Sequence, residues 1–265
     1  MALFNFYNFD KPGPGINPGE PRKTGIRRVL ELLELSGGNL FKGGLLSFLT
    51  FLPWYVGTLL SIRTHALAFM FLAGILGGMI AAPQVVGIAD TALRAMRDEP
   101  GLWWMTYKAA WKRNWKASLL PGAIAGCLVS ALVFSLAHLD YSSVSLWTLV
   151  LYLLSAWFLF GMITYVIPQI ALFDMSLKGI LVNSVMLQLR YPKRTFGAVL
   201  IQILYWGAFV LFYPISPIVL PITGLWLPLF LGLCAVYNAI EEAFDLERIV
   251  KEAQENKKNE TQIAT

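Results

Sequence analysis

Six long apolar segments govern how this chain can fold. A helix needs about 20 residues to cross the roughly 30 Å hydrocarbon core of a bilayer. Segments of this length lie near residues 40–62, 66–89, 117–137, 144–168, 197–213 and 219–239. The last two form one apolar run, which Pro214, Pro217 and Pro221 divide. Since 57% of the residues are hydrophobic and only 14% are charged, the sequence predicts an all-α integral membrane protein with six transmembrane helices.

Basic residues are distributed unevenly around these segments. Six crossings place both termini and the connectors 90–116 and 173–196 on one side of the membrane. That side carries every Lys and Arg except Arg63, if Lys42 is counted at the adjoining end of the first span. Because basic loops stay in the cytoplasm, we expect a multi-pass protein of the bacterial cell membrane with both termini cytoplasmic. The net charge of +5 then sets topology and does not indicate a nucleic-acid partner.

The polar segments divide the chain into three parts. Residues 1–38 are expected to form a cytoplasmic arm and a short surface helix, which Thr24 caps and Gly37-Gly38 end. Residues 39–240 form the transmembrane domain. Residues 241–265 form a charged cytoplasmic helix and tail, with Ala243, Leu246, Val250 and Ala253 at helical spacing. This apolar stripe fits a helix docked in a partner's groove, or a tail packed on its own connectors.

The connector 102–116 has the pattern of an amphipathic helix. At about 100° per residue, its aromatic side chains fall in one sector and its basic side chains in the next. Indole rings prefer the headgroup level of a bilayer, and lysines meet anionic lipid there. The pattern therefore predicts an interfacial helix that contacts lipid through Trp103, Trp104, Tyr107, Lys108, Trp111, Lys112, Trp115 and Lys116.

Parts of the first connector recur in the second. Pro83-Gln84, Asp90 and the sequence KRNWKASL at 112–119 have counterparts in Pro168-Gln169, Asp174 and KRTFGAVL at 193–200. Two spans separate the copies, so a repeat would be parallel. Two membrane loops can also share such residues without a repeat. Each Pro-Gln pair is a candidate helix break on a solute pathway, or an ordinary bend at the end of a span.

Motifs for catalysis or for binding a cofactor or a metal are missing from the sequence. It has no Walker-type phosphate loop, no GxSxG and no HExxH. The two histidines, His65 and His138, lie at the outer ends of spans, and we expect Cys127 and Cys234 to be buried apolar side chains. We therefore expect no enzyme, no cofactor and no metal. In the second span, Gly74, Gly77 and Gly78 indicate close helix packing.

One stretch resembles a known family. Gly87-Ile88-Ala89, Ala92-Leu93, Arg97-Asp98-Glu99 with Gly101, Trp111-Lys112 and Asn114-Trp115-Lys116 look like the signature of the YesL-like bacterial membrane proteins, a domain family of unknown function. The resemblance covers about 35 residues. This chain departs from the pattern by Trp where Phe is common, by Pro100 and by its Pro/Gly-rich arm. Members tend to be encoded beside binding-protein-dependent sugar importers and two-component sensors.

Two functions of different classes follow as expectations. The resemblance implies an accessory or scaffold membrane protein that associates with subunits of an ABC-type sugar importer or with its sensor. The importer's permease itself is not expected, because the Glu-Ala-Ala coupling loop is missing. The alternative is a stand-alone transporter or channel for a small neutral solute, built on the Pro-Gln breaks. For this alternative, the near absence of ionisable groups in the spans argues against proton or sodium coupling, but a facilitator of neutral solutes would need none.

Overall fold

The computed structural model describes residues 22–99, 101–213, 215–249 and 252. These residues are helical apart from short connections, with no strand among them. The elements are α1 (Ile26–Thr64), α2 (Leu67–Leu72), a π-helical turn (Ala73–Gly77), α3 (Gly78–Met96), α4 (Trp103–Ala137), α5 (Leu146–Leu172), α6 (Leu177–Arg190), α7 (Pro192–Leu211), a 3₁₀ turn (Ser216–Ile218), α8 (Leu220–Thr223) and α9 (Trp226–Phe244).

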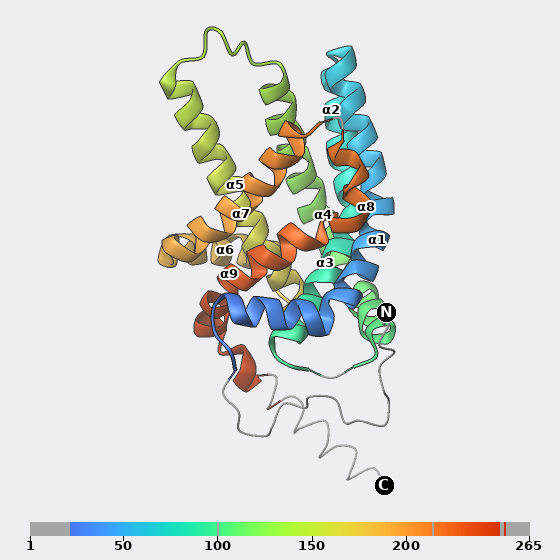
Figure 1. Ribbon diagram of the computed structural model, residues 1–265, viewed down its shortest axis with the longest axis vertical. Coiled ribbons are helices and arrows are strands. Elements are labelled where there is room, and N and C mark those ends of the chain that lie inside the picture. The colour runs from blue at the N-terminus through green and yellow to red at the C-terminus, as the bar shows by residue number, and fades with distance from the viewer. Residues whose placement is uncertain (1–21, 100, 214, 250–251, 253–265) are drawn as a thin grey trace, which may run out of the picture.

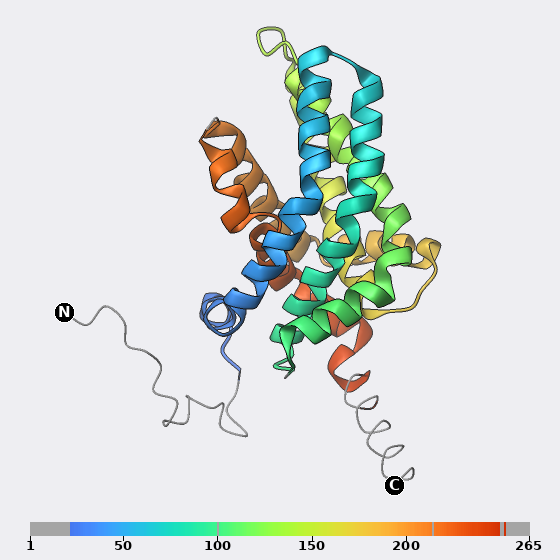
Figure 2. The same ribbon diagram turned by 90° about the vertical axis from the view of Figure 1, so that its right-hand side faces the viewer.

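Six helices are long and apolar enough to cross a membrane, which confirms the predicted fold class. They are Ile26–Thr64, Leu67–Met96, Trp103–Ala137, Leu146–Leu172, Pro192–Leu211 and Trp226–Phe244. Figures 1 and 2 show α1, α3 and α4 rising side by side. The lower part of α1 lies across one end of this bundle, and α6 lies across the lower part of α5. We call this end, with the α3–α4 turn and the end of α9, the basic face.

Glycines allow α3 and α4 to pack with their backbones in contact. A Cβ atom on Gly78 would lie 2.1 Å from the carbonyl oxygen of Gly122, and one on Gly126 would lie 2.3 Å from that of Gly74. A Cβ atom on Gly77 would lie 2.5 Å from Cβ of Trp54. The predicted close packing of the second span is therefore confirmed, and its partners are α4 and α1.

Several expected boundaries differ in the structure. The cap of α1 is Gly25, not Thr24, and α1 continues through Gly37-Gly38. Neither of these two glycines takes the positive φ that ends a helix. The connector 102–116 is not a separate helix but the first part of α4, which runs on through Pro121. Figure 2 shows that this part lies oblique to the rest of α4.

The last span also begins later than expected. Instead of one helix from residue 219, the chain forms the 3₁₀ turn and the short α8 before it enters α9 at Trp226. The break lies at Gly224, whose φ of 42° is a conformation that glycine adopts without steric cost. Two buried clusters hold the helices together, one around Leu40, Ile88 and Phe230 and a smaller one around Tyr165 and Ile240.

Candidate functional site

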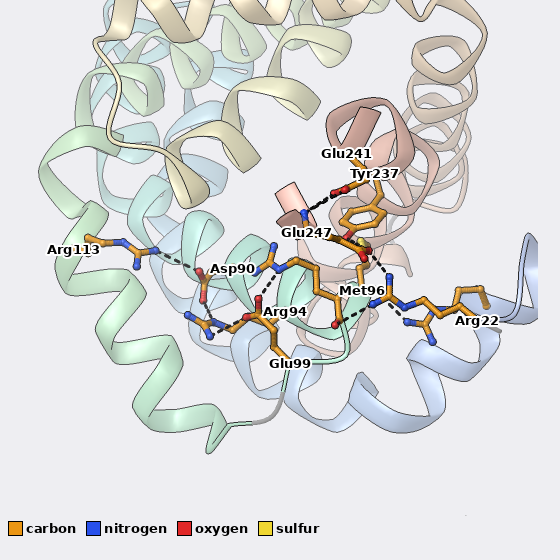
Figure 3. A network of polar contacts seen from close by, with 11 residues as sticks. Arg22, Asp90, Arg94, Met96, Glu99, Arg113, Tyr237, Glu241 and Glu247 are labelled. Carbon is orange, nitrogen blue, oxygen red and sulfur yellow. Dashed lines mark hydrogen bonds and ion pairs between the residues drawn. The ribbon is translucent and has the colours of Figure 1, made fainter. Parts of the chain in front are cut away.

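A network of ion pairs on the basic face is centred on the turn that follows α3 (Figure 3). Asp98 in this turn has a left-handed backbone conformation, with φ of 57°. Its carboxylate accepts hydrogen bonds of 2.8 and 2.9 Å from Arg28 on α1. It also pairs with Nε of Arg22 at 2.8 Å. The turn thereby holds the first described residues of the chain against the end of α3.

The same network reaches the C-terminal segment. Arg22 forms an ion pair with Glu247, and the hydroxyl of Tyr237 donates to the Glu247 carboxylate at 3.4 Å. The backbone N–H of Glu247 donates to the Glu241 carboxylate at 3.2 Å. Partial burial lowers the pKa of the Arg22 guanidinium, but the hydrogen bond to Glu247 and the charges of Glu247 and Asp98 outweigh it and raise that pKa. Arg22 is therefore a fixed cation that joins segments from opposite ends of the sequence.

A second branch of the network ties three helices together through Asp90 on α3. Only 3% of the Asp90 side chain is exposed, and its carboxylate pairs with Arg94 at 2.8 Å and with Arg113 on α4 at 3.4 Å. Arg113 also donates to the carbonyl oxygen of Ala171 at the end of α5, at 2.8 Å. Because a buried carboxylate without partners is costly, these two arginines are what make Asp90 tolerable inside the bundle.

Between α1, α3 and α4 the basic face has a small hollow of about 60 Å³. Its lining is mostly polar and includes Ser36 and Asn39 of α1, Thr91 and Arg94 of α3, and Glu99. Arg94 pairs with Glu99 at 3.1 Å, so the charges in the hollow compensate each other. This volume has room for a few water molecules.

The residues predicted to contact lipid do not all lie on one side of α4. Trp104 is 54% and Trp115 39% exposed, whereas Trp103 and Trp111 are half-buried. Tyr107 is 3% exposed and is buried inside the protein. The three predicted lysines, Lys108, Lys112 and Lys116, are exposed.

Tyr107 is thus a correction to the predicted aromatic stripe. Its hydroxyl donates to Oε1 of Gln84 on α3 at 2.6 Å. Its ring also packs on Gly87, where a Cβ atom would come within 2.7 Å of it. The Gly87-Ile88-Ala89 part of the family-like signature therefore lies at a helix contact, where Ile88 and Ala89 are fully buried.

Neither Pro-Gln pair ends a helix, and the two glutamines make similar contacts. Pro83 lies inside α3 and Pro168 inside α5. Gln84 binds a hydroxyl of α4, and the buried Gln169 donates to Ser184 of α6 at 2.8 Å and to the carbonyl of Tyr165 at 3.0 Å. Each glutamine thus joins its span to the connector helix that follows it.

The rest of the proposed repeat diverges. Asp90 is buried within α3, whereas its counterpart Asp174 is exposed and lies beyond the end of α5. The first connector is continuous with its following span in α4, whereas α6 and α7 are separate helices.

The structure describes two residues of the apolar stripe predicted for partner contact, Ala243 and Leu246, and both pack on the chain itself. Leu246 is 2% exposed and belongs to the cluster around Tyr165 and Ile240, on which Ala243 also packs. The assignment of the buried Leu246 as a partner contact is therefore wrong, whereas that of the half-buried Ala243 stays a prediction. Val250 and Ala253 lie outside the described residues.

No family model, no curated protein and no solved structure matches this chain. Within the described ranges, no group of three or more His, Cys, Asp or Glu side chains could hold a metal ion. The ion-pair network is the part of the site that sequence reasoning missed. The one available signal was the charged triplet Arg97-Asp98-Glu99, which resembled a family signature without indicating its contacts.

Proposed function

We propose that the chain is an accessory membrane subunit whose basic face lies in the cytoplasm and contacts subunits of a bacterial ABC-type sugar importer or its sensor. The partner class rests on the resemblance of residues 87–116 to the YesL-like proteins, and we propose that the chain belongs to that family. The proposal concerns a contact at the membrane surface and not a catalytic step.

One observation carries the proposal: a row of cations along the first turns of α4. Lys108, Lys112 and Lys116 are spaced by one helical turn and are exposed, and they form no ion pair with another described residue. The exposed indoles of Trp104 and Trp115 lie on the same part of the helix. By contrast, the arginines Arg28, Arg94 and Arg97 near α3 are paired with carboxylates in the ion-pair network.

This arrangement suits a docking surface at the headgroup level. Lysines are compact cations that remain hydrated until a partner neutralises them, and charge complementarity steers such encounters. The network beneath keeps α4 in place against α3 and α5, so the row is displayed on a fixed support. Indoles beside it anchor the helix at the membrane surface.

Site-specific photo-cross-linking tests the proposal. A photoreactive residue replaces Lys108 in one variant, and Trp147, which is 77% exposed at the start of α5, in a matched control. Each variant is co-expressed with the subunits of a sugar importer and its sensor. We expect an adduct with one of these subunits from position 108 only, and lower sugar uptake when Lys108 and Lys112 become Glu. Equal adducts from both positions, or uptake unchanged by the charge reversal, would count against it.

A specific observation also favours the alternative, a stand-alone transporter or channel for a small neutral solute. Gln169 and Gln188 are at most 1% exposed, and the side-chain oxygen of each has no partner among the described residues. Buried amides of this kind can bind a polar solute. Solute flux into vesicles that contain only this protein, abolished by Gln84→Leu with Gln169→Leu, would support the transporter over the accessory subunit.

A further inference from the structure

The chain's only two histidines meet at the end of the molecule opposite the basic face. His65 follows α1 and His138 follows α4, and their ring centres lie 4.6 Å apart with an interplanar angle of 67°. Both residues are exposed. We propose that this pair is a binding site for a divalent transition-metal ion of the Cu²⁺, Ni²⁺ or Zn²⁺ class.

The separation of the rings fits two imidazoles on one ion. An imidazole nitrogen binds such an ion at about 2.0–2.1 Å, so each ring centre lies about 3.2 Å from the metal. Two rings at a right angle around the ion then have centres about 4.5 Å apart, and at a tetrahedral angle about 5.2 Å. The observed 4.6 Å matches the first value, the cis arrangement of the tetragonal sites that Cu²⁺ and Ni²⁺ prefer.

The protein already orients one of the two ligands. Nδ1–H of His138 donates to the carbonyl oxygen of Phe134 at 2.8 Å. This hydrogen bond fixes the tautomer and leaves Nε2 with its lone pair, as in many metal-binding histidines. The ring of Phe134 packs on His138 with a centre-to-centre distance of 4.2 Å. On the other side, the backbone N–H of His65 is bonded to Ser61, and its φ of 56° places the residue just past the last turn of α1.

The surrounding charges favour a cation on balance. Both histidines are the C-terminal caps of their helices, where the aligned peptide dipoles place negative partial charge. Asp140 follows in the loop, and its carboxylate accepts hydrogen bonds from the hydroxyls of Ser142 and Ser143 at 2.7 and 2.8 Å. Arg63 in the last turn of α1 is the one described cation that opposes the bound ion at this end. Water or an external ligand completes the coordination, because two protein ligands leave positions open.

Copper binding to the purified full chain tests this site. The protein is purified with a tag that contains no histidine. Cu²⁺ is the only metal added, and free glycine competes with any weaker sites. We expect one Cu²⁺ per chain, with an electron paramagnetic resonance spectrum split by two nitrogens. His65→Asn and His138→Asn should each weaken binding at least tenfold and leave a single nitrogen. Asn suits position 65 because it tolerates a positive φ.

Two further results decide the outcome. Arg63→Gln keeps both histidines and removes the opposing charge, so it should bind Cu²⁺ as tightly as the unmodified chain or more tightly. Equal Cu²⁺ uptake by the unmodified chain and by both Asn variants would show that the ion binds elsewhere and would overturn the proposal.

Discussion

Two aspartates with the same backbone conformation differ in how far their ion pairs are removed from water. Asp98 has φ of 57° and Asp245 has φ of 50°. The carboxylate of Asp98 is 23% exposed and pairs with Arg28, whose side chain is only 14% exposed. The carboxylate of Asp245 is 57% exposed and pairs with Arg248 in solvent. An ion pair is worth more when it is removed from water and fixed by hydrogen bonds.

We therefore expect Asp98→Asn to destabilise the protein by about 1–3 kcal/mol, because it removes a charged hydrogen-bond acceptor from Arg22 and from the largely buried Arg28. Asp245→Asn is the matched control, since Asn tolerates the same positive φ, and it should cost less than about 1 kcal/mol. Thermal unfolding in detergent measures both changes. Trypsin should also cut faster after Lys23 in the Asp98 variant. Equal shifts for the two substitutions would contradict the proposed role of Asp98.

Tyr107 illustrates why single residues were hard to place from the sequence. A helical wheel correctly separated aromatic from basic side chains on the first part of α4. It does not indicate which aromatic residues face protein and which face lipid, because both surroundings are apolar. The deciding facts were the small Gly87 and the acceptor Gln84 on α3, and neither can be paired with Tyr107 by spacing alone.

At the scale of helices, the contact between α3 and α4 leaves no room for a side chain at Gly78. Gly78→Ala would force a methyl group against the carbonyl oxygen of Gly122, and backbone atoms cannot move aside as a flexible side chain can. We expect a loss of about 2 kcal/mol or more, through overpacking and separation of the helices.

Gly197→Ala on α7 is the control, because no atom lies within 4 Å of the position that its Cβ would take. Alanine there should be neutral or should stabilise the helix by up to about 1 kcal/mol. Unfolding midpoints of the two variants in the same detergent compare these effects. A Gly78 variant as stable as the Gly197 variant would show that α3 and α4 are not in backbone contact.

The six spans could be predicted because hydropathy over about 20 residues is a property of each segment by itself. The boundaries of α1, α4 and α9 could not, since they depend on φ values at individual residues. Gly37-Gly38 stays helical, whereas Gly224 turns the chain. In isolation, both positions have the same permissive residue.

At the scale of the whole molecule, the predicted orientation is open to a direct test. Single cysteines are introduced at Ser143 and at Lys193 after Cys127 and Cys234 are replaced by Ala. If the basic face is cytoplasmic, an impermeant thiol reagent on intact cells should label position 143 and spare position 193. Labelling at 193 but not at 143 would reverse the topology.

The ion-pair network could not be predicted from the sequence because its partners are far apart along the chain. Composition indicates that charges gather on one side of the membrane, but not which of them meet. Arg22, Asp98 and Glu247 come from three separate segments, and each has other oppositely charged residues closer in sequence. Only the packing of α1, α3 and α9 brings them together.

The Arg22–Glu247 contact also has a consequence for the order of events during synthesis. Its partners are 225 residues apart, so Arg22 leaves the ribosome long before Glu247 exists. Until then Asp98 is the one of its two carboxylate partners that Arg22 can pair with. The arrival of Glu247 closes the network, so a chain cut short before that residue never acquires the second contact. The Arg22–Glu247 ion pair can therefore form only after translation has passed residue 247.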